Sequence, residues 1–190
     1  MNNENTNYRR TGLSRVKTSN ANDILSSQGR VPPQAIDLEE VVLGALMLEK
    51  EAVNAIIDIL TPDVFYKEAH ELIYIAIKEL FSKSDPIDIL TVTNQLKSSG
   101  NLDIVGGPYY ISQLTNRVVS SANIEYHARI ILQKYIQRQL ILISSETIKD
   151  AYEDTTDVFD LLDSAENKLF QISENNLRRN YDQMPDLVSM

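Results

Sequence analysis

The residue types that most often carry chemistry are scarce in this sequence. Its 190 residues include two histidines, His70 and His127, and no cysteine, which excludes a thiol nucleophile, a zinc knuckle and an iron–sulfur site. Neither histidine has a second histidine or a carboxylate at the spacing that places two metal ligands on one helical face. We therefore expect no metal site. Because His70 follows the aromatic pair Phe65-Tyr66, we interpret it as a packed or hydrogen-bonded side chain.

The sequence supports nucleotide binding and acid–base catalysis no better than it supports metal binding. A phosphate-binding P-loop needs a Gly-Lys pair, and none occurs in the chain. Gly106-Gly107 could present backbone amides to an anion, but paired glycines are more typical of a simple turn. We expect the neighbouring acids Glu39-Glu40, and Asp85 with Asp88, to form a solvated face. The sequence thus predicts no catalytic, cofactor-binding or metal-binding residue.

The charge of the chain is divided between two regions of opposite sign. The 18 basic and 27 acidic residues give a net charge of −9, but residues 1–34 carry five basic residues and two acidic ones. The rest of the chain therefore holds 13 basic and 25 acidic residues, a net charge of −12. Nucleic-acid binding needs clustered Lys and Arg, so we do not expect the folded part to bind DNA. The absence of cysteine and of any apolar run of about 18 residues predicts a cytoplasmic protein that is neither secreted nor inserted in a membrane.

The hydrophobic pattern predicts an all-α fold, a compact globular helical bundle followed by a long antiparallel helical hairpin. Residues 1–30 are polar and without period, which is typical of a disordered tail. Apolar residues recur at helical spacing over 31–118, which we expect to form the globular subdomain. Its helices are separated by Thr61-Pro62, Ser84-Asp85-Pro86, Gly100 and Gly106-Gly107-Pro108. Gly44 lies inside the first helix at a cost of about 1 kcal/mol, which predicts close packing by another helix.

We expect residues 119–175 to form the hairpin. One helix can run from Asn123 to about Tyr152 without Gly or Pro, and the turn Asp154-Thr155-Thr156 separates it from a second helix. Apolar residues of the second helix follow a heptad seam that we expect to hold the hairpin together: Val158, Leu162, Ala165, Leu169 and Ile172. We interpret residues 176–190 as the start of a linker.

The long helix has a second apolar stripe that the hairpin itself does not need. It consists of Ile130, Ile141, Ile148 and Tyr152, which fall within about 40° of one another around the helix axis. Contiguous exposed apolar patches usually mark interaction sites, so we expect another protein chain to cover this stripe.

Several longer motifs resemble one known family. The run from Val31 to Leu48, VPPQAIDLEEVVLGALML, is similar to the start of the N-terminal domain of DnaB-type bacterial replicative helicases. Further similar motifs follow in the same order: Asp63-Val64-Phe65-Tyr66 with His70, Pro86-Ile87-Asp88 with Thr91, Leu102-Asp103-Ile104-Val105-Gly106-Gly107 with Tyr110, Ala122-Asn123-Ile124, and Leu161-Leu162-Asp163-Ser164-Ala165-Glu166. The resemblance covers residues 31–175.

The resemblance implies an N-terminal collar of a ring helicase, in which domains pair through the hairpin as a trimer of dimers and contact the C-terminal domain of primase. A helicase loader is a further candidate partner. A RecA-like domain of the family uses ATP and magnesium and translocates on single-stranded DNA. This sequence contains no Walker motif, so those sites have no positions here. We expect an excised domain that is not itself an enzyme, attached in the full-length protein to an ATP-dependent DNA helicase.

On this basis we assign Ile130, Ile141, Ile148 and Tyr152 to the contact with another subunit or partner. Tyr110 and Asp37, which begin or neighbour helices at the base of the hairpin, are our candidates for the primase side. The alternative is an all-α protein-interaction or regulator domain that uses its basic tail on DNA, and its affinity would fall steeply with salt. The acidic body argues against this alternative. The oligomeric state of the isolated domain, the dependence on a loader and the ordering of the tail on a partner stay open at this point.

Overall fold

The computed structural model describes the backbone of residues 31–118, 120, 122–155 and 157–181, and the side chains of these residues up to 174. The predicted tail at 1–30 lies outside the described residues. Every regular element within them is helical, which confirms the all-α prediction. The elements are α2 (Ile36–Leu48), α3 (Lys50–Ile56), the 3₁₀ turn η1 (Pro62–Val64), α4 (Glu68–Ser82), α5 (Ile89–Ser98), α6 (Gly107–Asn116), α7 (Ile124–Ala151) and α8 (Val158–Tyr181).

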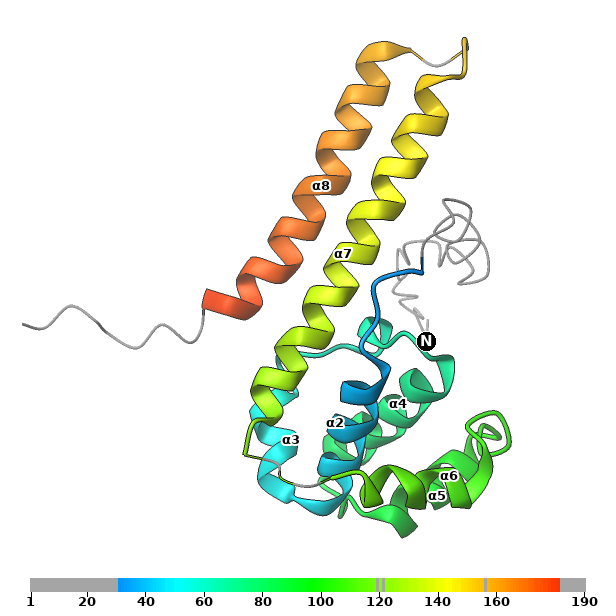
Figure 1. Ribbon diagram of the computed structural model, residues 1–190, viewed down its shortest axis with the longest axis vertical. Coiled ribbons are helices and arrows are strands. Elements are labelled where there is room, and N and C mark those ends of the chain that lie inside the picture. The colour runs from blue at the N-terminus through cyan, green and yellow to red at the C-terminus, as the bar shows by residue number, and fades with distance from the viewer. Residues whose placement is uncertain (1–30, 119, 121, 156, 182–190) are drawn as a thin grey trace, which may run out of the picture. The chain divides into compact units, whose positions relative to one another are not determined.

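Helix α2 is the centre of the globular bundle. It packs against α3, α4, α5, α6 and α7, and most of its residues from Glu39 to Met47 are buried. A helix that is apolar on all sides must be covered on all sides, and α2 is surrounded in this way. The core continues through Ile56, Ile73, Ile77 and Leu96 to the first half of α7. Figure 1 shows α2 and α3 beside the lower part of α7, with α4, α5 and α6 farther from it.

Helix α5 forms despite β-branched residues that would suit a strand. Its N-cap is Asp88, whose Oδ1 accepts hydrogen bonds from the backbone N–H groups of Leu90 and Thr91 at 2.8 and 2.9 Å. The Thr91 hydroxyl oxygen in turn accepts from the Asp88 backbone N–H at 2.9 Å, which completes a capping box. Gly100, with φ of 73°, ends the helix as predicted. Local capping therefore prevails over the intrinsic preference for a strand.

Close helix packing at Gly44 is also confirmed. A Cβ added to this residue of α2 would lie 2.8 Å from the carbonyl carbon of Leu114 in α6 and 2.8 Å from Cγ2 of Val118. Two backbones can approach this closely only where one of them has no side chain. The glycine pair at the start of α6 forms the expected turn, because Gly106 and Gly107 have φ values of 95° and 73°.

Helices α7 and α8 form an antiparallel hairpin (Figure 1). The first half of α7 belongs to the core through Ala128, Ile131 and Leu132, and its second half packs on α8. Lys168 of α8 forms an ion pair with Glu146 of α7 at 3.2 Å. Helix α8 continues to Tyr181, so the segment taken as a linker from 176 begins as helix.

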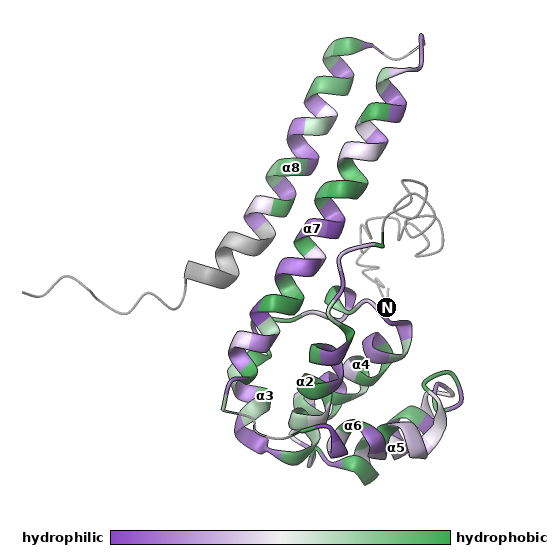
Figure 2. Cartoon of the chain, in the orientation of Figure 1, coloured by the Kyte–Doolittle hydropathy of each residue, from purple (hydrophilic) through white to green (hydrophobic). Residues whose placement is uncertain are grey.

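The predicted seam of α8 is only partly covered within one chain. Ala165 and Ile172 are half-buried, whereas Val158, Leu162 and Leu169 are exposed. Leu161 and Lys168 are also half-buried, so the more covered side of α8 lies to one side of the heptad seam. Figure 2 shows apolar residues on the hairpin helices well away from the bundle. None of the helices in the described part of the chain is long and apolar enough to cross a membrane.

Candidate functional site

A buried polar network lies between α2, α4 and α6. Glu39 and Glu40 are 1% and 6% exposed, so the prediction that they form a solvated face was wrong. A Glu39 carboxylate oxygen lies 2.7 Å from Nδ1 of His70, and the other accepts the backbone N–H of Tyr66 at 2.8 Å. His70 is fully buried and hydrogen-bonded, which confirms its interpretation as a packed side chain.

Tyr110 and Arg117 extend this network toward the surface. The Tyr110 hydroxyl lies 2.7 Å from Nε2 of His70 and donates to Glu40 at 3.3 Å. The Arg117 guanidinium lies 3.0 Å from Glu40 and 3.8 Å from Asp37, whose side chain is exposed. The two residues assigned to the primase side, Asp37 and Tyr110, are thus brought to one place through the Glu40–Arg117 ion pair.

The pKa of Tyr110 should identify this network experimentally. Burial, followed by the charge and hydrogen bond of Glu40, raises that pKa to about 12. A raised pKa means that the protonated phenol stabilises the fold, fully below the ordinary value of about 10 and progressively less as the pH rises to about 12.

We therefore expect the tyrosinate absorbance of Tyr110→Phe, subtracted from that of the unchanged protein, to show a midpoint near pH 12. Circular dichroism at each pH confirms that the domain is folded. A midpoint near the ordinary tyrosine value of about 10 would contradict the network.

Arg138 is a structural residue that the sequence analysis did not identify. This buried residue of α7 donates from Nη1 to the carbonyl of Pro33 at 2.8 Å and from Nη2 to the carbonyl of Val64 at 2.7 Å. Its guanidinium also lies over the rings of Tyr66 and Tyr135, 5.4 and 5.8 Å from their centres. Burial lowers its pKa. One signal was available, since Arg138 falls on the same side of the helix as Ile131 and Tyr135, where an apolar residue is the norm.

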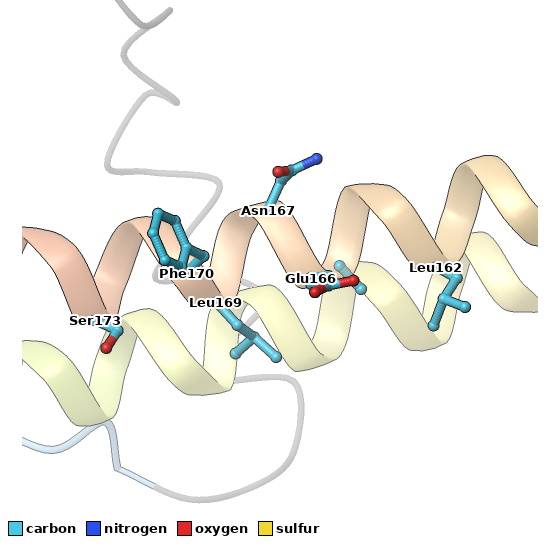
Figure 3. Close-up of a pocket in the computed structure, with 7 residues that line it drawn as sticks. Leu162, Glu166, Asn167, Leu169, Phe170 and Ser173 are labelled. Carbon is cyan, nitrogen blue, oxygen red and sulfur yellow. The ribbon is translucent and has the colours of Figure 1, made fainter.

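The outer faces of the hairpin carry the residues assigned to subunit contact. On α7, Ile130 and Ile141 are half-buried, while Ile148 and Tyr152 are exposed. On α8, Phe159 and Phe170, which the sequence analysis did not single out, are exposed together with three residues of the seam. A shallow groove runs along α8 and is lined by Leu162, Ala165, Glu166, Asn167, Leu169, Phe170 and Ser173 (Figure 3). All of these side chains come from one helix, so nothing else in the described chain closes the groove.

The described residues offer surfaces for binding. Among the described residues, no three or more His, Asp or Glu side chains come close enough together to hold a metal ion. Within this network, Glu39 and His70 are buried in the core and join α2 to α4, and the Tyr110 hydroxyl joins His70 to α6. The exposed chemistry is the apolar surface of the hairpin and the Asp37–Arg117 pair at its base.

Comparison with known proteins identifies relatives of the chain. Residues 31–133 match the family model described as "DnaB-like helicase N terminal domain". The replicative DNA helicase DnaB of Rhodothermus marinus is 44% identical over 160 residues, which are 84% of this chain and 17% of that relative. The corresponding helicase of Geobacillus stearothermophilus is 40% identical over 147 residues, covering 76% of this chain and 32% of the relative. The chain thus spans a third or less of the length of these curated relatives.

Solved structures show the same fold. The crystal structure of the N-terminal domain of DnaB helicase from Mycobacterium tuberculosis matches with a TM-score of 0.70 and 32% identity, covering 74% of this chain and 99% of that one. A second structure, described as that of a DnaB-like replicative helicase and its interactions with primase, matches with a TM-score of 0.60 over 73% of this chain and 30% of that one. Its identity is 22%, so this likeness concerns the fold alone.

Proposed function

The chain belongs to the family of DnaB-like helicase N-terminal domains, and from this premise we propose that it is a scaffold domain that assembles a replicative helicase ring and recruits primase. The observation that carries the proposal is the apolar surface that the hairpin leaves open in a single chain. We further infer that the whole protein unwinds DNA with ATP and magnesium, through residues outside these 190.

Assembly would use the two outer faces of the hairpin. The α7 stripe of Ile130, Ile141, Ile148 and Tyr152 and the α8 groove around Leu169 and Phe170 present apolar area that gains about 25 cal/mol per Å² when it is covered. A two-fold pairing of hairpins would bury the same patch on both subunits, which is the usual geometry of homodimers. Dimers of this kind, three to a ring, would form the collar.

Primase would contact the base of the hairpin. Asp37 and Arg117 are exposed there, and Glu40 joins Arg117 to Tyr110 and so to the buried network. Membership of the DnaB-like family, whose resemblance implies a contact with primase, supports this choice of partner. A helicase loader is a further partner that the same collar could bind.

Light scattering after size-exclusion chromatography tests both parts. We expect the unchanged chain to self-associate and Ile141→Asp and Leu169→Asp to shift it toward the monomer, because each would place a charge in the apolar contact. Gln171→Asp, at an exposed polar position of α8, is the matched control and should keep the mass of the unchanged chain.

When the C-terminal domain of the cognate primase is added, we expect a complex of higher mass than the unchanged chain alone. The increase in mass should be smaller for Asp37→Lys. The assembly proposal fails if Ile141→Asp and Leu169→Asp keep the original mass at equal concentration. The primase proposal fails if no complex forms with the unchanged chain.

A further inference from the structure

The tip of the hairpin exposes large apolar side chains that neither hairpin helix covers. Tyr152 at the end of α7 is 85% exposed, and Val158 and Phe159 at the start of α8 are 71% and 76% exposed. We call these three residues the tip patch. They lie at the end of α7 and the start of α8, and Figure 1 shows these two helix ends far from the bundle. Each of the three is more than two thirds exposed, so packing among the described residues does not explain their type.

The tip patch is surrounded by acidic residues. The segment 146–166 contains a single basic residue, Lys149, and eight acids: Glu146, Asp150, Glu153, Asp154, Asp157, Asp160, Asp163 and Glu166. Together with Lys168, the ion-pair partner of Glu146, residues 146–168 carry a net charge of −6, which is half of the −12 of the chain beyond residue 34.

Helix stability accounts for only some of these acids. Asp157 caps α8 by accepting the backbone N–H groups of Phe159 and Asp160 at 2.8 and 3.3 Å, and Glu146 pairs with Lys168. Acids at a helix N-terminus also interact favourably with the helix dipole. Asp150 lies in the last turn of α7, and Glu153 and Asp154 directly follow the end of that helix, where the helix dipole disfavours negative charge. A local choice that opposes stability usually serves function.

The negative charge around the tip patch determines which kind of binding partner fits it. A second copy of this chain would bring one acidic tip against another, and like charges placed face to face oppose association. A partner with Lys and Arg beside apolar residues would satisfy both the acids and the exposed rings. We propose that the tip patch binds a basic amphipathic helix of another protein, with its apolar face on Phe159 and Tyr152 and its cations toward Asp150, Glu153 and Asp154. This function goes beyond ring assembly. Tyr152 also belongs to the α7 stripe that we assign to assembly, so Phe159, which lies outside that stripe, carries the test of the separate function.

A designed peptide of about 18 residues, with Lys and Leu at helical spacing, is the probe for this proposal. Its binding to the whole chain is measured by fluorescence anisotropy at low and high salt. We expect micromolar binding that weakens as salt rises, since surface charges are screened. A peptide of the same pattern with Glu in place of Lys should not bind.

Two variants and a charge-matched control locate the site. The triple change Asp150→Asn, Glu153→Gln and Asp154→Asn should weaken binding about tenfold, which is the size expected for three exposed ion pairs. Phe159→Ser should also weaken it at least tenfold. The control triple Asp58→Asn, Asp85→Asn and Asp103→Asn changes the net charge equally at exposed positions of the bundle and should change affinity less than twofold.

Three results would overturn the proposal. Equal losses in the two triple variants would mean that the peptide responds to net charge alone. If Phe159→Ser bound the peptide as tightly as the unchanged chain does, the peptide would make no apolar contact with Phe159. A Phe159→Ser variant with a lower mass in light scattering and the same peptide affinity would assign the patch to a second copy. Ile141→Asp, which tests subunit assembly, should bind the peptide like the unchanged chain, so the two proposals can fail separately.

Discussion

Replacing Gly44 by Ala should lower the free energy of unfolding by about 3 kcal/mol, at the upper end of the cost of overpacking a core. The new methyl group would meet the carbonyl group of Leu114 and the side chain of Val118, with the carbonyl carbon only 2.8 Å away. The obstacle is helix backbone, which cannot turn aside as a flexible side chain would. In an exposed helix the same substitution would stabilise by about 1 kcal/mol, so helix propensity predicts the opposite sign.

Gly100→Ala is the matched control for this substitution. Gly100 has a φ of 73° but no atom within 4 Å of the added Cβ, so only backbone strain of about 1 kcal/mol should oppose the change. Urea unfolding followed by circular dichroism compares the two variants. If Gly44→Ala proved as stable as the unchanged protein, the close contact between α2 and α6 would not exist in solution.

The helices could be predicted from the sequence because their causes are local. Each apolar stripe follows the 3.6-residue period, and each end has a nearby signal, such as Asp88 before α5 and Gly100 after it. Gly44 also indicated a tertiary contact between two helices, because a residue that disfavours the helix is retained inside it only where close packing requires it. The partner helix itself, α6, could not be deduced from that one residue.

The polar network was missed because its causes are distant in the sequence. In the sequence, Glu39 is one of two neighbouring acids of the kind usually found on a surface. Its partner His70 is 31 residues later along the chain, in α4, so the contact depends on the tertiary fold. Arg138 likewise has its acceptors on Pro33 and Val64, which lie in two other segments. Charge patterns predict exposure on average, and a buried ion is an exception that only the tertiary fold explains.

The side of α8 that packs on α7 could not be predicted, for a different reason. Helix α8 has more apolar residues than one face can bury, since Val158, Phe159 and Phe170 are exposed in addition to the half-buried Leu161 and Ile172. A heptad count selects the most regular of several overlapping stripes, but it does not show which stripe a neighbour covers. The excess of apolar residues is itself informative, because it indicates that a single chain leaves part of this helix for a partner.

Arg138→Ala should have the second large effect, a loss of about 3 kcal/mol in the free energy of unfolding. The substitution leaves the carbonyls of Pro33 and Val64 without their donor, and each charge-assisted hydrogen bond contributes roughly 1.5–3 kcal/mol. Arg138→Lys should lower the free energy of unfolding by less, because the lysine ammonium keeps the positive charge. Some loss should remain, because an ammonium cannot span two acceptors as the planar guanidinium does. Lys134→Ala, on the same helix, should change stability by no more than about 0.5 kcal/mol.

Hydrogen exchange can show what Arg138 does beyond stability. Its two carbonyl partners belong to the entry of α2 and to η1, so the residue ties the middle of α7 to the bundle at two points. In Arg138→Ala we expect faster exchange around Val64 and in the first half of α7, while the α7–α8 contact at Glu146 and Lys168 keeps its protection. Uniformly faster exchange along the chain would mean that Arg138 supports only global stability. Selective loosening would instead make Arg138 the residue that sets the angle at which the hairpin leaves the bundle, and therefore the geometry of the collar that we propose.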